Sequence, residues 1–454
     1  MTTHPQPPGS TAPAPPRRTA FAEGAAQLRA AAATEPGRLR TIGALLAALI
    51  IAFGAVTAWQ TASRSSAADD VLHSSQPLSE GAAEIYSSLA DANTAASSAF
   101  LAGGEEPKTT TERYENDIGK AAAKLVTAAA STDPGSPSAK TITQLNQLLP
   151  EYKGLVERAR ANNRLGYPVA GAYLRAANSM MQDEMLPAAK KLYTTENDRL
   201  RADYSDATPY PWFAIALGVL ALAALAWAQR RHYLRTNRVL NRGLVAATTA
   251  SAVVLLWLVT GHSFARVGLD ASYDHGVRSL NVLNDARIAS LNARGNENLT
   301  LVSRGAETKE VGGKDEDLYD YSFQQDMGTL DKGLAKAASL ADDQAGTKPV
   351  QTATRSMRTW KTRHTAARKL DDDGEYDAAL KAVIGTKKGT TGECFDLVDT
   401  NLNKALSHEQ TEFKQSATDG RDALTGLPAG TATLAVLGAA GALLGVGRRL
   451  SEYR

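Results

Sequence analysis

The chain of 454 residues contains one cysteine, Cys394, and aromatic residues make up only 6% of it. A single cysteine excludes a disulfide framework and a zinc site built from thiolates. Basic and acidic residues are nearly balanced, at 50 and 48, so the net charge gives no reason to expect nucleic acid as a partner. A phosphate-binding loop, a GxSxG motif and the kinase signatures are also missing. The sequence therefore predicts no enzyme, no catalytic residue and no cofactor.

Metal-binding motifs are missing as well. None of the seven histidines belongs to an HExxH motif or to a pair at four-residue spacing beside a carboxylate. The acidic run 371–375 is similar to a calcium loop, but an EF-hand needs an oxygen ligand five places before its glycine, and Lys369 stands there. A helix break explains this run better, and no metal site is predicted.

Four uncharged apolar tracts stand out against a mean hydropathy of -0.27. A helix of about 20 apolar residues is long enough to cross a hydrocarbon core of about 30 Å. The tracts therefore predict four transmembrane helices. They cover residues 41–59, 211–228, 244–261 and 427–446. A cleaved signal peptide is the alternative for the first tract, although Ala62 and Ser63 give only a weak cleavage signal.

The charges around these tracts predict the orientation of the protein. Residues 1–40, 229–243 and 447–454 together hold 13 basic and three acidic side chains, and basic residues near membrane ends stay in the cytoplasm. We therefore expect a multi-pass protein of the plasma membrane with both termini in the cytoplasm. Residues 1–40 are expected to be a disordered basic tail, since the first 20 are rich in proline and polar residues. The segments 60–210 and 262–426 are then extracytoplasmic.

The two extracytoplasmic segments are similar to each other. Residues 114–119 (YENDIG) match residues 323–328 (FQQDMG) at an offset of 209, and Tyr167 matches Tyr376 at the same offset. A duplicated unit is the simplest explanation, with chance similarity between two helical segments as the alternative. The sequence thus predicts an all-α membrane protein with four transmembrane helices and two tandem extracytoplasmic four-helix bundles.

Breaks in the helical pattern divide each segment into four expected helices. The breaks are expected at 103–107, 133–137 and 166–168 in the first segment, and near 305–317, 344–349 and 371–374 in the second. The sequence shows no break between the first transmembrane helix and the first extracytoplasmic helix. These two helices are therefore expected to be nearly continuous.

Two groups of residues are candidates for interactions. The basic loop has two explanations: it fixes the topology and attracts anionic lipid, or it binds an acidic cytosolic partner. Its arginines are Arg230, Arg231, Arg235, Arg238 and Arg242. The small residues Gly438, Gly441 and Gly445 in the last transmembrane helix favour close helix packing, within one subunit or in a homodimer. An alanine- and glycine-rich composition explains these glycines equally well.

The predicted architecture resembles two known groups of proteins. Helical bundles that continue into membrane helices resemble the sensory domains of chemoreceptors and sensor kinases, although this chain has no cytoplasmic output domain. Two bundles on four membrane helices with basic inner ends resemble the GlnX-like membrane proteins of actinobacteria over residues 40–447. This resemblance implies a transducer that relays the amino-acid status reported by an extracytoplasmic solute-binding lipoprotein to a cytosolic serine/threonine kinase. The alternatives are an envelope scaffold without ligand and a direct small-molecule sensor.

Overall fold

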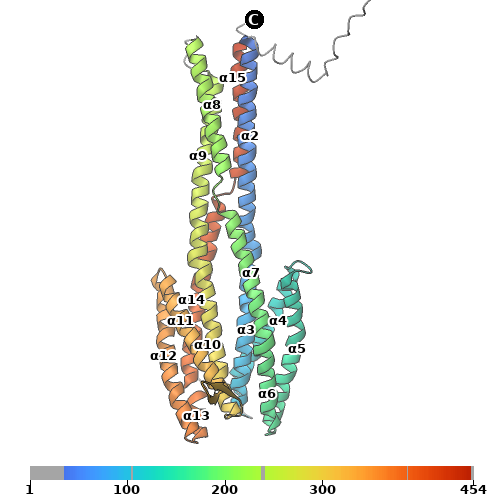
Figure 1. Ribbon diagram of the computed structural model, residues 1–454, viewed down its shortest axis with the longest axis vertical. Coiled ribbons are helices and arrows are strands. Elements are labelled where there is room, and N and C mark those ends of the chain that lie inside the picture. Colours follow the sequence, from blue (N-terminus) through green and yellow to red (C-terminus); the bar gives the residue numbers. More distant parts are fainter. Residues whose placement is uncertain (1–34, 104–105, 237–240, 386, 451–454) are drawn as a thin grey trace, which may run out of the picture. The chain divides into compact units, whose positions relative to one another are not determined.

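A computed structural model describes residues 35–103, 106–236, 241–385 and 387–450 (Figure 1). Nearly all of these residues are helical. The chain divides into two compact units. We call residues 35–62, 211–260 and 426–450 the apolar unit, and residues 63–210 and 261–425 the polar unit. Of the predicted tail of residues 1–40, residues 1–34 lie outside the described residues.

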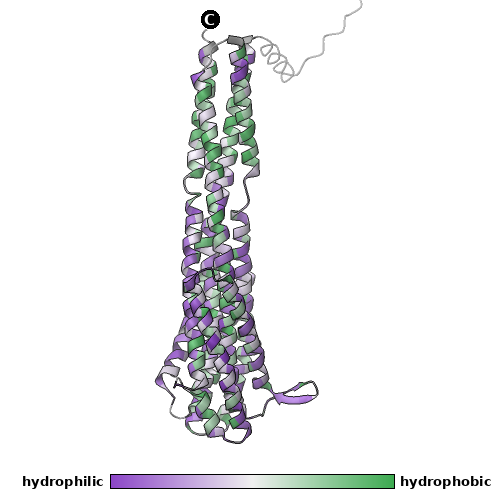
Figure 2. Ribbon diagram, turned by 90° about the vertical axis from the view of Figure 1, so that its left-hand side faces the viewer, coloured by the Kyte–Doolittle hydropathy of each residue, from purple (hydrophilic) through white to green (hydrophobic). Residues whose placement is uncertain are grey.

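The apolar unit contains the four predicted transmembrane helices. They lie in α2 (Glu35–Asp70), α8 (Trp212–Thr236), α9 (Arg242–Ala271) and α15 (Leu427–Leu450). Each helix has a segment long and apolar enough to cross a membrane, and hydrophobic residues dominate these segments in Figure 2. The four helices indicate a membrane protein. Because α2 begins at Glu35, residues 35–40 are helical and do not belong to a disordered tail.

Small residues let the helices of the apolar unit approach one another closely. Gly243 of α9 lies against Gly441 and Gly445 of α15, and a Cβ atom at Gly243 would overlap the carbonyl oxygen of Gly441. The amide nitrogen of the Asn241 side chain also donates a hydrogen bond to the carbonyl oxygen of Gly445 at 2.8 Å. A Cβ atom at Gly438 would lie 3.4 Å from atoms of Ala250 and Ile50. All three predicted packing glycines of α15 therefore contact other helices of the same chain.

The first segment of the polar unit follows the predicted helix breaks. After α2 come a π-helical turn η1 (Val71–Ser75), α3 (Gln76–Leu101), α4 (Lys108–Ala130), α5 (Pro137–Arg164), α6 (Val169–Met180), a second π-helical turn η2 (Met181–Met185) and α7 (Leu186–Ala207). The side chain of Ser136 accepts a hydrogen bond from the amide of Ala139 and so caps α5. Gly166 ends α5 with a φ of 71°.

The second segment has more irregular structure than the sequence predicts. It contains η3 (Ser272–Val277), α10 (Arg278–Ser303), β1 (Thr308–Val311), β2 (Lys314–Asp317), α11 (Leu318–Leu340), α12 (Gln344–Asp372), α13 (Tyr376–Val383) and α14 (Thr391–Asp422). The expected break at 305–317 is a β-hairpin of antiparallel strands, turned by Gly312 and Gly313, which both have positive φ. The break expected at 344–349 lies earlier, at 341–343, because Asp343 caps α12, and Pro349 lies inside that helix.

Two helices leave the apolar unit without a break in their helical hydrogen bonding. The helical run 37–101 contains η1, and the run 242–303 contains η3. These π-helical turns begin at Val71 and Ser272, 201 residues apart. The other two candidate membrane helices, α8 and α15, are preceded by non-helical residues, at 208–211 and 423–426. Each segment thus begins with an uninterrupted helix and ends at a break.

The two segments share one hydrophobic core. The helices α3 and α10 lie side by side in Figure 1 and contact each other. Most residues of α3 are buried, and many are alanine, serine or threonine, as expected for a helix surrounded by other helices. The core contains Leu89 and Tyr152 from the first segment and Phe323 and Trp360 from the second. The polar unit is therefore one body built from both segments.

The close contact between α9 and α15 predicts how glycine substitutions affect stability. Gly243→Ala should lower the free energy of unfolding of the detergent-solubilised protein by about 1–3 kcal/mol, since the new methyl group must displace the backbone of α15. Gly447→Ala is the matched control, because a Cβ atom there meets no neighbour within 4 Å. Thermal unfolding of the two variants checks this prediction, and equal melting temperatures would contradict it.

Candidate functional site

Where α3 packs on α10, residues at equivalent positions of the two segments lie opposite each other. The hydroxyl of Thr94 donates a hydrogen bond to the carbonyl oxygen of Leu291 at 2.8 Å, and a Cβ atom at Gly295 would lie 3.5 Å from that hydroxyl oxygen. Thr94 and Gly295 are 201 residues apart, which is the offset of the two π-helical turns. Further along, the side-chain amide of Asn298 donates to the hydroxyls of Ser97 and Ser98. Polar groups thus tie the two central helices together.

A cavity of about 230 Å³ lies between α3, α7, α10 and α14. Both segments line it at corresponding positions, such as Glu80 and Asn281, which again differ by 201. The lining begins directly beside the π-helical turns, because Gln76 follows η1 and Val277 ends η3. The polar lining residues are mostly amides and hydroxyls: Gln76, Ser79, Ser87, Tyr193, Asn197, Asn281, Asn284, Asn403, Ser407 and Gln410.

Hydrogen bonds cross this cavity from one segment to the other. The hydroxyl of Tyr193 donates to the side-chain oxygen of Asn281 at 2.6 Å. One carboxylate oxygen of Glu80 accepts hydrogen bonds from the side chains of Gln76 and Gln410, each at 3.1 Å. A polar molecule in the cavity can replace these bonds with its own donors and acceptors. The lining therefore suits a small polar ligand.

Ion pairs join the segments on one side of the cavity. Arg113 of α4 contacts Asp91 at 2.7 Å and Asp399 of α14 at 3.2 Å. Arg287, which lines the cavity, donates to the other oxygen of Asp399 at 2.9 Å. Burial raises the pKa of Asp91 to about 7, although Arg113 opposes this shift. Losing either arginine would leave buried carboxylates unpaired.

Two acidic groups lie near Tyr86 at the edge of the core, where Asp326 is half-buried and Asp285 is exposed. Burial raises the pKa of Asp326 to about 7, and its carboxylate accepts a hydrogen bond from the side chain of Asn296 at 2.8 Å. Burial also raises the pKa of Asp285. The pKa of Tyr86 is raised to about 12, first by burial and then by Asp285 and Asp326. Ionising these acids therefore costs free energy in the folded protein.

A buried network holds the second segment together. Glu297, 1% exposed, accepts hydrogen bonds from Arg294 at 2.5 Å and from the indole nitrogen of Trp360 at 3.0 Å. His364 lies between two carboxylates, with 3.0 Å from Nδ1 to Glu297 and 2.8 Å from Nε2 to Asp320. Burial lowers the pKa of His364, but the two carboxylates outweigh it and hold that pKa above its ordinary value. This network fixes α10 against α11 and α12.

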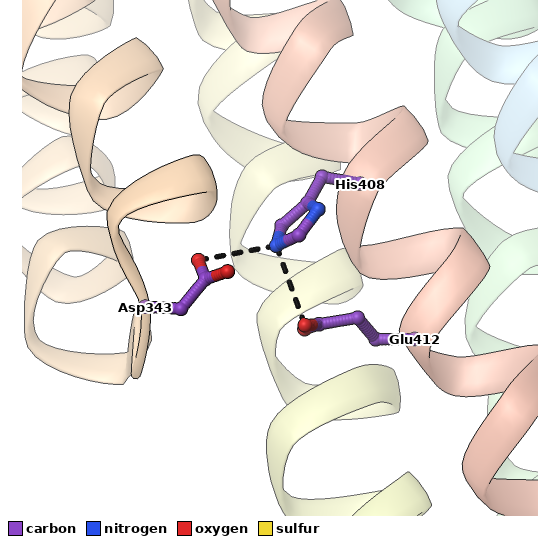
Figure 3. Close-up of side chains that lie close together, drawn as sticks. All are labelled: Asp343, His408 and Glu412. Atoms are coloured by element: carbon purple, nitrogen blue, oxygen red, sulfur yellow. Dashed lines mark hydrogen bonds and ion pairs between the residues drawn. The ribbon is translucent and has the colours of Figure 1, made fainter.

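The structure also brings together three side chains that sequence analysis did not single out. Figure 3 shows His408 and Glu412 of α14 beside Asp343 at the start of α12. The Nε2 atom of His408 lies 3.1 Å from Asp343 and 3.4 Å from Glu412. The three ligand atoms lie close enough together to hold a metal ion. In the sequence, the four-residue spacing of His408 and Glu412 could have indicated this site. Asp343 could not have been included, because it lies 65 residues before His408.

The predicted arginine loop is only partly described. Arg230 is exposed near the end of α8, and Arg242 is exposed at the start of α9. Arg231 is half-buried, and its guanidinium lies over the ring of Trp227 at 5.4 Å. Arg238 and the side chain of Arg235 lie outside the described residues.

Comparison with known families identifies part of the chain. Residues 67–205 match the family model of the actinobacterial sensor domain. The match begins near the end of α2 and ends within α7, so it includes η1 and every residue of the first segment that lines the cavity. No curated protein and no solved structure matches the chain. A sensor domain together with four candidate membrane helices suggests a sensory or signalling role.

The raised pKa of Asp326 predicts how stability depends on pH. Burial raises its folded-state pKa from the ordinary 3.8 to about 7, so its contribution to stability is complete below pH 4 and is lost as the pH rises to 7. Asp326→Asn should therefore gain stability relative to the wild type between pH 5 and pH 8, by up to about 1.4 kcal/mol for each pKa unit. Thermal unfolding at the two pH values measures this gain. Asp331→Asn, at an exposed position of α11, is the control.

Proposed function

We propose that this protein is a transmembrane sensory transducer and that a small polar solute binds in the cavity between its two segments. We also propose that the two segments are copies of one sensor unit. The observation that carries the proposal is the position of the cavity. It is lined by both segments beside η1 and η3, the π-helical turns in the two helices that continue without a break from the candidate membrane spans.

The hydrogen bonds across the cavity give a mechanism for signalling. A ligand shifts a conformational equilibrium only if it binds one state better than another. A solute that forms hydrogen bonds with Tyr193, Asn281 and Gln410 would replace the bonds between the two segments. It would therefore favour a different spacing of the segments. A helix shift of about 1–2 Å is typical of such transitions. The π-helical turns allow it, because they form weak points in the helical hydrogen bonding.

The distribution of basic residues supports a membrane topology. We propose that both segments are extracytoplasmic and that both termini and the loop at 229–243 are cytoplasmic, since basic residues gather at those ends. The arginines of this loop would then face anionic lipid or an acidic cytosolic partner. The GlnX-like resemblance implies a serine/threonine kinase as the partner there. It also implies a solute-binding lipoprotein as an extracytoplasmic partner, which is the alternative to direct sensing.

The cavity favours direct sensing over the two alternatives. A lipoprotein that delivers the signal by docking needs only the outer surface of the polar unit, and a scaffold without ligand needs no polar cavity. A homodimer gains no support from Gly441 and Gly445, because their close contacts are made within one chain.

Thermal unfolding of the full chain in lipid nanodiscs tests the proposed ligand site. A panel of amino acids, amides and small sugars is added one at a time. A ligand at 100 times its Kd should stabilise the protein by about 2.7 kcal/mol. Asn284→Leu should abolish this stabilisation, because it removes polar groups from the lining. Gln325→Leu, at an exposed position of α11, should keep it.

The outcomes separate the candidate functions. Saturable stabilisation that Asn284→Leu removes supports direct sensing. Stabilisation that requires an added solute-binding lipoprotein supports the partner route. If neither solute nor lipoprotein stabilises the protein, the sensory proposal is wrong and the scaffold function is favoured.

A further inference from the structure

We propose that Asp343, His408 and Glu412 bind a divalent transition-metal ion of the zinc type. In a tetrahedral site with ligands about 2.0–2.1 Å from the ion, neighbouring ligand atoms lie about 3.3 Å apart. The Nε2 atom of His408 is 3.1 Å from an oxygen of Asp343 and 3.4 Å from an oxygen of Glu412. Figure 3 draws these two contacts as dashed lines. These two distances match the tetrahedral spacing, and all three ligand atoms lie within 4.8 Å of one another.

Hydrogen bonding alone satisfies this arrangement poorly. The Nε2 atom of His408 carries at most one proton, yet two carboxylate oxygens approach it. The 3.4 Å contact with Glu412 is longer than an ordinary hydrogen bond. A metal ion in place of the proton would interact with all three groups at once.

The ligands are held in place by their surroundings. The carboxylate oxygen of Asp343 that faces His408 also accepts a hydrogen bond from the amide of Gly346 at 2.7 Å, which fixes it as the cap of α12. His408 and Glu412 are one turn apart on α14 and therefore share one face of that helix. An ion would meet ligands that are already oriented.

Space and charge beside the three ligands favour a cation. A cavity of about 190 Å³ is lined by Glu412, Asp342 and His275, and it leaves room for water ligands. His275 lies 3.6 Å from Asp342. The buried carboxylate of Glu409 lies near Gly346, since a Cβ atom there would be 3.1 Å from its oxygen. His408 thus lies beside two carboxylates and His275 beside a third, with the buried Glu409 close to the start of α12.

The first segment forms the same helices without this cluster. Buried residues of α7 recur in α14 at an offset of 213, as in the pair Glu196 and Glu409. At this offset, the residues of the first segment that correspond to His408 and Glu412 are Thr195 and Arg199. The helix caps correspond as well, with Ser136 in place of Asp343. The fold therefore does not require the three ligands.

The site would connect elements that matter for signalling. It joins the start of α12 to α14, and the neighbouring cavity reaches Gly276 and His275 of η3. A bound ion would restrain the second segment beside the π-helical turn, where the first segment has no equivalent ligands.

Zinc binding by the full chain tests the site. Metal-free protein in lipid nanodiscs is titrated with Zn²⁺ by calorimetry, and retained zinc is measured by mass spectrometry after gel filtration. We expect one ion per chain. His408→Ala and Glu412→Gln should each raise the Kd at least about tenfold, because even outer-sphere partners contribute 10- to 100-fold to metal affinity.

A histidine of the first segment provides the control. His73 is exposed and pairs with Asp69, at 3.3 Å and four-residue spacing, so His73→Ala should leave the zinc Kd unchanged. Circular dichroism checks that each variant is folded, and Glu412→Gln preserves the shape of the side chain if His408→Ala does not fold. The proposal is overturned if the wild type binds no zinc, if it binds Ca²⁺ in preference, or if the ligand variants bind zinc as tightly as the wild type.

Discussion

The packing of α3 against α10 is the constraint on which the polar unit depends. Each helix begins one of the two segments, and their contact at Thr94 and Gly295 turns two sets of helices into one body with a common core. Small side chains make this contact possible, because a helix that is buried nearly all round leaves little room for large residues. The cavity lies along the same pair of helices, so its shape depends on how α3 and α10 are spaced.

Polar groups make this interface capable of change. An apolar interface of the same size would gain free energy simply from burial, whereas Asp91, Arg113 and Asp399 bind the segments by charge and Tyr193 and Asn281 by a hydrogen bond. The hydrogen bond between Tyr193 and Asn281, which both line the cavity, can be exchanged for hydrogen bonds to a ligand at little net cost. The continuous helices through η1 and η3 connect that exchange to the candidate membrane spans. The match of residues 67–205 to a sensor domain agrees with this account.

Much of the fold could be predicted from the sequence, because its signals are local. Runs of uncharged apolar residues located α2, α8, α9 and α15, and proline and glycine located the breaks after Leu101, Ala130 and Arg164. The hairpin at 308–317 was missed although Gly312 and Gly313 are a hairpin signal, since its strands are highly charged and lack β-branched alternation. The candidate sites could not be predicted. The cavity needs the pairing of α3 with α10, and the ligand cluster needs Asp343 to meet His408 from 65 residues away.

The most direct measurement of the central claim is the distance between the two segments with and without a bound solute. Ala123 on α4 and Lys332 on α11 are exposed positions that correspond at the offset of 209, and Cys394 is the natural cysteine to be replaced by serine. Spin labels at these positions, read by double electron–electron resonance in nanodiscs, report the spacing of the segments. We predict that a saturating solute shifts the distance by about 1–2 Å or more and that Asn284→Leu abolishes the shift. An unchanged distance with a solute that binds and stabilises the protein would contradict the account.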